Sequence, residues 1–162
     1  MPIPFVQILC GCPTSGKSTY SLKEIAHPAS ADTVILSTDN IIEKYAREEG
    51  KTYNEVFNDY FFKANAEMYE QLRTAIREKK SVIWDQTNLT VKSRKKKLSN
   101  FPSYYIKVAV YFILPYHELV KRNENRPGKV IPLETLKSMY DSYVVPSCLE
   151  GFDRCIYGDS YR

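Results

Sequence analysis

The stretch Gly11-Cys12-Pro13-Thr14-Ser15-Gly16-Lys17-Ser18 decides the fold, because it fits the P-loop pattern G-x-x-x-x-G-K-[ST]. Glycines let the backbone curl so that consecutive N–H groups point at phosphate oxygens, and the following helix adds its positive end. Lys17 would reach the outer phosphates, and Ser18 would offer a hydroxyl to Mg²⁺. The alternative is an accidental glycine turn. An apolar run before the loop and a helical pattern after it favour a nucleoside triphosphate site.

Around this loop, apolar runs alternate with helical patterns along the chain. Strands are expected over Phe5–Cys10, 33–37, 81–84, 104–113 and, near the end, within 152–159. Helices are expected after the P-loop, from near Asn40, over 53–80, from near Val91, and over 117–125 and 133–143. When strands alternate with helices, each helix forms a right-handed crossover between two parallel strands of one sheet. The sequence therefore predicts a three-layer α/β fold, with a mainly parallel sheet of about five strands and helices on both faces.

The composition suits one domain over residues 1–162. Apolar residues make up 43% of the chain, but no apolar run is long enough to span a membrane. The N-terminus lacks the basic region of a signal peptide. Four cysteines are too few for a disulfide scaffold and, with two histidines, make a zinc site improbable; reduced and mostly buried thiols are expected. We therefore expect a soluble cytoplasmic protein with no membrane partner.

The net charge of +4 is unevenly distributed. The segment from Gln86 to His117 contains no Asp or Glu and carries six cations, which leaves −2 for the remainder. A patch of one sign attracts anions better than a diffuse excess does. The six are Lys92, Arg94, Lys95, Lys96, Lys97 and Lys107. An acidic partner is therefore favoured, although a solvated basic helix is the plainer interpretation.

Polar side chains follow each predicted strand, and in parallel sheets the ligand lies at the carboxyl ends of the strands. Asp39, after the second strand, is either a helix N-cap or a general base that accepts the proton of an attacking hydroxyl. Asp85, after the third strand, has the Walker-B position and would help to hold Mg²⁺ through water. Alternatively, Asp85 fixes Thr87 and Asn88 or a substrate-binding arginine, or caps the next helix.

After the fourth strand, Arg122 and Arg126 lie four residues apart and precede a Pro-Gly break. A helix and loop of this kind could close over the phosphates as a lid and stabilise the transferring group. The alternative is a solvated helix with Glu118 and Glu124 as neighbours of Arg122. The aromatic residues could suggest base stacking, but most have core spacing in the 53–80 helix or lie inside strands, which favours packing.

Several segments together resemble the phage-type 5′-polynucleotide kinase family. These are GCPTSGKST, STDN, DQTNL, and ELVKRNENR followed by IPLETLKSMY, which span most of the chain in the family's order. The resemblance implies a P-loop kinase fold and transfer of the γ-phosphate of ATP to a 5′-hydroxyl of DNA or RNA, using Mg²⁺. It places the triphosphate at the P-loop, from Gly11 through Thr19, with Lys17 and Ser18 binding the triphosphate and Mg²⁺. It also implies that Asp85 organises the substrate side of the site.

The same resemblance implies individual roles. Asp39 would be the general base, Lys17 and Arg126 would stabilise the transition state, and Arg122 would assist on the ATP side. The family's acceptor-binding arginine, three residues after the base, is replaced here by Ile42, with Lys44 as the nearest cation. No D-x-D-G-T phosphatase motif is present, so a kinase module alone is expected.

Three functions remain open from the sequence. The first is a 5′-polynucleotide kinase with ATP and Mg²⁺ as cofactors and a nucleic acid 5′-OH terminus as substrate; its acceptor-binding residues would be Asp39, Asp85, Thr87, Asn88, Lys92, Arg94 and Lys96. The second is a small-molecule kinase acting on a nucleoside, sugar or antibiotic. The third is a non-catalytic nucleotide-binding module. The basic stretch favours the first, because a small neutral acceptor gains nothing from it. The oligomeric state does not follow from the sequence.

Overall fold

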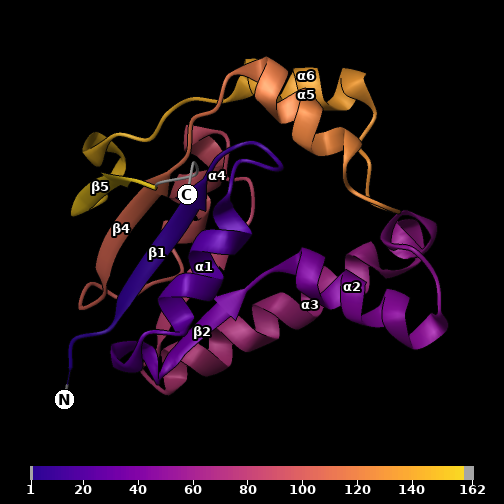
Figure 1. Cartoon of the computed structure of the whole chain (residues 1–162). Helices are drawn as coiled ribbons and strands as arrows, with labels where there is room; N and C mark the ends of the chain where they lie inside the picture. Colours follow the sequence, from indigo (N-terminus) through magenta and orange to yellow (C-terminus); the bar gives the residue numbers. More distant parts are fainter. Residues whose placement is uncertain (1, 159–162) are drawn as a thin grey trace.

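The computed structural model describes residues 2–158 and contains a five-stranded, fully parallel sheet (Figure 1). The strand order is β2-β3-β1-β4-β5. Because β1 lies in the middle, its carboxyl end delivers the P-loop to the centre of one sheet edge. The strands are β1 (Phe5–Cys10), β2 (Thr33–Leu36), β3 (Ser81–Asp85), β4 (Ile106–Tyr111) and β5 (Arg154–Tyr157). The predicted three-layer α/β P-loop kinase fold is confirmed.

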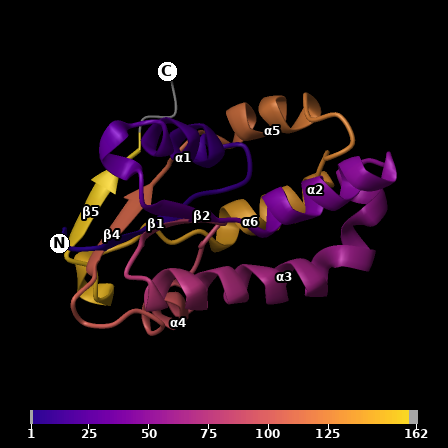
Figure 2. The same ribbon diagram turned by 90° about the horizontal axis from the view of Figure 1, so that it is seen from below.

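Helices cover both faces of the sheet. Helix α1 (Lys17–Ile25) lies on one face, and α3 (Tyr53–Arg77) and α4 (Val91–Leu98) lie on the other (Figure 2). Alternate residues of the buried strands serve the two faces: Ile8 packs into the α3 side and Leu9 into the α1 side. The larger core therefore lies beneath α3, where Trp84, Met68 and Leu72 are completely or almost completely buried.

Two further groups of elements extend beyond the carboxyl edge of the sheet. Helix α2 (Thr38–Glu49) packs along the first half of α3, while α5 (Tyr116–Glu124) and α6 (Leu133–Ser142) follow β4 (Figure 1). Short 3₁₀ turns occupy η1 (Pro28–Ser30) and η2 (Cys148–Glu150). Thr52 begins α3 with a capping box, in which its hydroxyl and the Glu55 side chain each accept a backbone N–H.

The predicted elements occur in the expected order, and no end is shifted by more than three residues. The largest shifts are at the fourth strand, which begins at Ile106, and at α3, which ends at Arg77. The last predicted strand is observed as β5; its predicted end at Asp159 lies outside the described residues. Of the four thiols, Cys10 and Cys12 are buried, but Cys148 is exposed, which corrects the expectation of mostly buried cysteines.

Charged and polar residues interrupt the apolar residues along α3, the longest helix. Within residues 2–158, none of the helices has both the length and the apolar character that crossing a bilayer requires.

Candidate active site

The P-loop wraps tightly between β1 and α1. Gly16 has a φ of 105°, a conformation that favours glycine, and it precedes the first residue of α1. A Cβ atom on Gly11 would lie 2.7 Å from Ser15 Oγ and 3.1 Å from Phe112 Cβ, so a side chain at this position would crowd the loop. Lys17 Nζ donates a hydrogen bond of 2.7 Å to the Cys12 carbonyl and thereby closes the loop on itself.

A cavity of about 830 Å³ opens above this loop, within the size range of ligand pockets. Its walls come from the P-loop, the ends of β2 and β3, the N-terminal half of α3, and the segment from α5 to α6. The predicted residues that line it are Pro13, Thr14, Gly16, Lys17, Ser18, Thr19, Asp39, Asp85, Thr87, Arg122 and Arg126. The cavity therefore brings together most of the residues singled out at the strand ends.

Asp85 stands at the end of β3 and faces the start of α1. Its Oδ2 accepts hydrogen bonds from Ser18 Oγ at 3.0 Å and Ser21 Oγ at 3.3 Å. Burial raises the pKa of the Asp85 carboxyl, and the Lys17 ammonium opposes that rise. An adjacent hydroxyl and carboxylate are oxygen ligands of the kind Mg²⁺ takes while keeping several waters. Ser18 and Asp85 therefore fit a Mg²⁺ site, and Asp85 does not cap α4, whose N-cap is Thr90.

Asp39 lies in the first turn of α2, with about half of its side chain exposed to the cavity. It is not the N-cap, because Ser37 has that role and accepts the Asn40 N–H. Tyr53 donates a hydrogen bond of 2.7 Å to Asp39 Oδ1, and Lys129 Nζ lies 3.6 Å from Oδ2. The carboxylate is therefore held in place while remaining open to a hydroxyl.

The segment after α5 forms the roof of the cavity. Arg122 donates to the Thr14 carbonyl at 3.1 Å and pairs with Glu118 at 3.2 Å, so it binds the P-loop itself. Arg126 lies beyond the end of α5 and also lines the cavity. Its Nη1 and Ser15 Oγ are buried and make no hydrogen bond with any residue of the described range 2–158. Two unsatisfied polar atoms beside the P-loop suit an anionic ligand.

The cations of the site are strongly desolvated. Burial lowers the pKa of Lys17, while the carboxylates of Asp85 and Asp39 oppose this change. Burial likewise lowers the pKa of Arg126, with Asp39 again opposing. Negative phosphates entering the cavity would favour the charged forms of both side chains. A bound polyanion such as a triphosphate would therefore stabilise both of these cations.

The predicted acceptor-binding residues divide into two groups. Thr87 lines the cavity, and its carbonyl accepts the Gly11 N–H at 2.9 Å. Asn88, in contrast, is buried, and its amide nitrogen donates to the Leu9 carbonyl at 2.7 Å. Asn88 has a φ of 47°, and this turn ties the end of β3 to β1. The assignment of Asn88 as a substrate contact is therefore corrected to a structural role.

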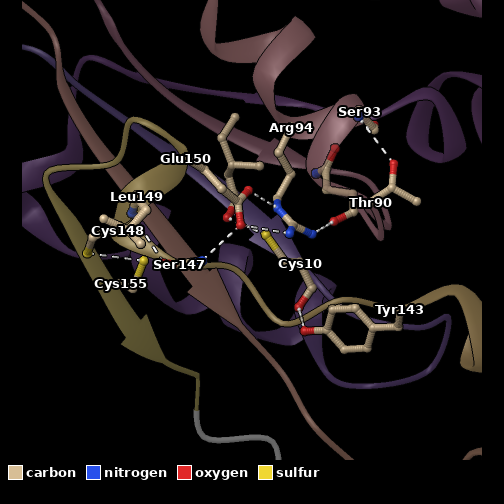
Figure 3. Close-up of polar contacts among 12 residues, drawn as sticks. Cys10, Thr90, Ser93, Arg94, Tyr143, Ser147, Cys148, Leu149, Glu150 and Cys155 are labelled. Atoms are coloured by element: carbon tan, nitrogen blue, oxygen red, sulfur yellow. Dashed lines mark hydrogen bonds and ion pairs between the residues drawn. The ribbon is translucent and has the colours of Figure 1, made fainter.

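The prediction that Arg94 binds the acceptor is wrong. Its side chain is completely buried and forms two hydrogen bonds with Glu150, at 2.7 and 3.0 Å (Figure 3). A third hydrogen bond, of 2.9 Å, runs to the Asn88 carbonyl. Because its guanidinium is paired inside the protein, Arg94 cannot meet the phosphates of an acceptor. The sequence could not reveal this, since Glu150 lies 56 residues away.

Lys92 and Lys96 are exposed on α4 but do not line the cavity. Lys97, on the same helix, turns inward, where it donates to Asn88 Oδ1 and lies 5.4 Å from the centre of the Trp84 ring. The acid-free segment is therefore partly internal. The exposed lysines of α4, including Lys95, remain a basic surface outside the cavity.

Sequence reasoning missed several residues of the cavity wall. Lys129 pairs with Glu43 at 2.7 Å as well as with Asp39, and it lies 4.7 Å from the centre of the Tyr53 ring. Lys129, which is distant in the sequence, therefore lies beside Asp39. Ile42 is completely buried in the core, so its position faces away from the cavity. Lys129 directly follows the Pro-Gly break. That break predicted a lid in this segment, but it did not predict the ion pair between Lys129 and Asp39.

The sequence profile of the AAA domain family matches residues 6–146. A curated relative, the L-seryl-tRNA(Sec) kinase of Methanococcus maripaludis (strain DSM 14266), is 33% identical over 153 residues. The match covers 90% of this chain and 55% of the relative, so the chain spans little more than half of that protein's length.

Among solved structures, a candidate kinase from Chloroflexus aurantiacus J-10-fl superposes with a TM-score of 0.70 at 18% identity, covering 98% of this chain and 86% of that one. A chain of the Pnkp1/Rnl/Hen1 RNA repair complex gives 0.66 at 23% identity, covering 88% and 44%. A fungal RNA kinase gives 0.56 at 14% identity, covering 100% and 77%. At these identities, the structural likeness shows the shared fold.

Proposed function

The chain belongs to the AAA domain family as a P-loop kinase, and on that premise we propose that it transfers the γ-phosphate of ATP to the 5′-hydroxyl terminus of DNA or RNA. The family implies ATP and, typically, Mg²⁺. The observation that carries the proposal is the common cavity, which Asp39, Lys17 and Arg126 all line. A phosphate donor and a hydroxyl acceptor could therefore meet with a base and two cations around the reacting atoms.

In this mechanism Asp39 accepts the proton of the acceptor hydroxyl as its oxygen attacks the γ-phosphorus. The bond from the γ-phosphorus to the bridging oxygen breaks, and ADP leaves with that oxygen. Lys17 and Arg126 would balance charge on the transferring group, while the P-loop N–H groups hold the remaining phosphates. Bound Mg²⁺, held at Ser18 and Asp85, would neutralise phosphate charge. Positioning and electrostatics supply most of the catalysis in such reactions.

The nucleic acid acceptor is supported by the exposed basic surface of α4 and by the resemblance of the four strand-end motifs. It is also supported by the names of two similar proteins, a tRNA kinase and an RNA kinase. A cytoplasmic location and a single kinase domain over 1–162 are part of the same proposal. Residues 1 and 159–162 of that range lie outside the described residues.

A second candidate acceptor is the serine hydroxyl of a charged tRNA, favoured by the 33% identity to the L-seryl-tRNA(Sec) kinase. Both acceptors present a hydroxyl close to a nucleotide. They differ in whether the attacking oxygen belongs to a sugar or to an amino acid, so the acceptor has to be tested directly.

The deciding experiment measures transfer of labelled γ-phosphate to a panel of acceptors. The panel contains 5′-OH DNA, 5′-OH RNA, seryl-tRNA, a nucleoside and gluconate. We expect transfer to a 5′-OH oligonucleotide, and loss of about 10²- to 10⁴-fold in Asp39→Asn with ATP affinity retained. Transfer to seryl-tRNA alone would establish the second candidate. Transfer to the nucleoside or gluconate alone would overturn the nucleic acid proposal, and ATP binding without any transfer would overturn the kinase assignment.

A further inference from the structure

Three aromatic rings form a continuous strip on the cavity side of α3. Tyr53, Phe57 and Phe61 follow one another at intervals of four residues, which places them along one side of the helix. The ring centres of neighbours are 5.7 and 5.3 Å apart, and the planes are tilted by 44° and 40°. All three residues line the cavity. We call these three rings the α3 strip.

The position of the strip relative to the reacting groups assigns it to the acceptor side. Its first ring belongs to Tyr53, whose hydroxyl is bonded to Asp39. The acceptor hydroxyl must approach Asp39, whereas the triphosphate must lie along the P-loop that holds Lys17. The rings extend from Asp39 along α3, so whatever is attached to the acceptor hydroxyl meets them next.

The strip is only partly used for packing. Tyr53 and Phe57 are half-buried against the core, but Phe61 is 40% exposed. Large apolar rings on a wet cavity wall cost solvation energy and are a recurring sign of a ligand surface. A flat heterocycle would stack on them regardless of its hydrogen-bonding pattern.

We infer that the α3 strip stacks the terminal nucleobase of the acceptor, so that the enzyme recognises a nucleotide end by its base and not by its hydroxyl alone. This inference rests on the proposed function and narrows its acceptor. Phe57 and Phe61 are the specificity-determining residues, and Tyr53 connects the base-binding surface to Asp39. Since stacking tolerates any base, recognition should depend on the presence of a base and little on its identity.

The chain offers a matched control. Phe62 neighbours Phe61 but is 82% exposed and does not line the cavity. Phe57→Leu and Phe61→Leu remove a ring from the cavity wall and keep an apolar side chain, whereas Phe62→Leu removes a ring from outside it. Because Phe61 is the more exposed strip residue, Phe61→Leu should fold as the wild type does, and thermal unfolding checks this.

The experiment measures equilibrium binding of two labelled 5′-OH trinucleotides in the presence of a non-hydrolysable ATP analogue. One carries a base at its 5′ terminus, and the other is abasic there. We expect the wild type to bind the base-bearing trinucleotide at least 5-fold more tightly, in line with stacking on an aromatic side chain. Phe57→Leu and Phe61→Leu should lose this preference without changing the affinity for the analogue. Phe62→Leu should keep it.

Equal binding of the two trinucleotides by the wild type would overturn the inference, as would the same loss in Phe62→Leu. Binding does not require catalysis, so the two proposals fail separately. Base-dependent binding without phosphate transfer would preserve the stacking surface and refute the kinase proposal for this acceptor. Phosphate transfer without any preference for the base-bearing trinucleotide would support the kinase proposal and refute the stacking surface. Failure to bind either trinucleotide would refute the stacking surface.

Discussion

At Asp39, two side chains from different elements converge on one carboxylate. Tyr53 comes from α3 and Lys129 from the segment between α5 and α6. Since Asp39 follows β2, three parts of the chain meet at the proposed base. Neither Tyr53 nor Lys129 belongs to the sheet. Removing either contact with Asp39 should therefore change the rate of the reaction more than the free energy of unfolding.

Tyr53→Phe tests this positioning role. The substitution keeps the ring of the α3 strip but removes the hydroxyl that donates to Asp39. We expect kcat for the oligonucleotide to fall by about tenfold, because small displacements of a catalytic group are costly. The acceptor KM should change by less than twofold. Steady-state kinetics separate the two parameters, and an unchanged kcat would show that the hydroxyl does not position the base.

Lys97 gives a pH-dependent prediction. Burial lowers its pKa from 10.5 to about 8, so the unfolded chain binds more protons than the folded protein between these values. The contribution of this side chain to stability is therefore lost as pH falls through 8 and fully present above 10.5. The free energy of unfolding of the wild type minus that of Lys97→Met should rise over this window, by at most about 1.4 kcal/mol per pH unit.

Urea denaturation at several pH values between 7 and 10.5 measures this difference. Lys95→Met, an exposed change on the same helix, controls for the loss of one positive charge. A difference that falls as the pH rises would contradict the assigned direction.

On the scale of elements, the turn η2 fixes α4 to the sheet. Glu150 in η2 pairs with Arg94 in α4 (Figure 3), and Arg94 also binds the Asn88 carbonyl near the P-loop. A buried ion pair of this kind adds little to the free energy of unfolding compared with an apolar pair of similar size. Removing only one partner is costly, because the other charge then stays buried without compensation. Its function is to keep the β3–α4 turn in place.

Arg94→Met and Glu150→Gln should each lower the free energy of unfolding by about 3–5 kcal/mol, since each leaves a buried charge without its opposite partner. The double variant should lose less than the sum of the two. Chemical denaturation measures these values. Strictly additive losses would contradict the energetic coupling of Arg94 and Glu150.

The roof of the cavity is fastened to α3 at Gly128. Asn54 donates its backbone N–H to the Gly128 carbonyl at 2.9 Å and its side-chain amide to the Val130 carbonyl at 3.1 Å. Gly128 has a φ of 68°, and an added Cβ would lie 2.6 Å from Thr52 Cβ. The backbone conformation and the close approach both require glycine at this position.

Gly128→Ala should displace Arg126 and Lys129 and lower kcat by about tenfold or more. Gly50→Ala is the matched control, because Gly50 has a φ of 65° but nothing lies within 4 Å of an added Cβ. Both variants should lose about 1 kcal/mol of stability from backbone strain, and Gly128→Ala should lose more because its added Cβ meets Thr52. Kinetics and denaturation together check this, and an equal loss of kcat in both would mean that contact with Thr52 is unimportant.

At the scale of the whole molecule, the parallel sheet gathers Lys17, Asp39 and Asp85 at one edge, although they come from three strands far apart in the sequence. The basic surface of α4 lies outside this cavity. A short acceptor should therefore bind without contacting α4, while a longer strand has the opportunity to reach it.

Salt dependence distinguishes these two modes. The KM of a long 5′-OH oligonucleotide should rise with KCl, with a log–log slope of about 0.7 for each phosphate contacted. In a variant with Lys92, Lys95 and Lys96 all changed to Gln, this slope should fall by about 1 or more for a 20-mer and stay unchanged for a dinucleotide. Equal slopes for the wild type and the variant on the 20-mer would exclude α4 from acceptor binding.

The sequence predicted those features that depend on local pattern. Apolar periodicity fixed the order of the elements, and the rule that strand ends share an edge brought Lys17, Asp39 and Asp85 together. Features that depend on packing between distant segments were not predictable. Arg94 is buried by a residue 56 positions away, and Asn54 meets the roof across 76 positions. The α3 strip shares the helical spacing of the core, so periodicity could not separate cavity wall from interior.

The fastening of the roof to Asn54 has one more consequence, which concerns how the roof and the proposed base are coupled. Asn54 directly follows Tyr53 in α3, so the two hydrogen bonds to Gly128 and Val130 join the roof to the turn of α3 that also holds Asp39. A movement of the roof away from α3 would break these hydrogen bonds and pull on the turn that carries Tyr53. Opening of the cavity for product release would therefore loosen the contact that positions Asp39.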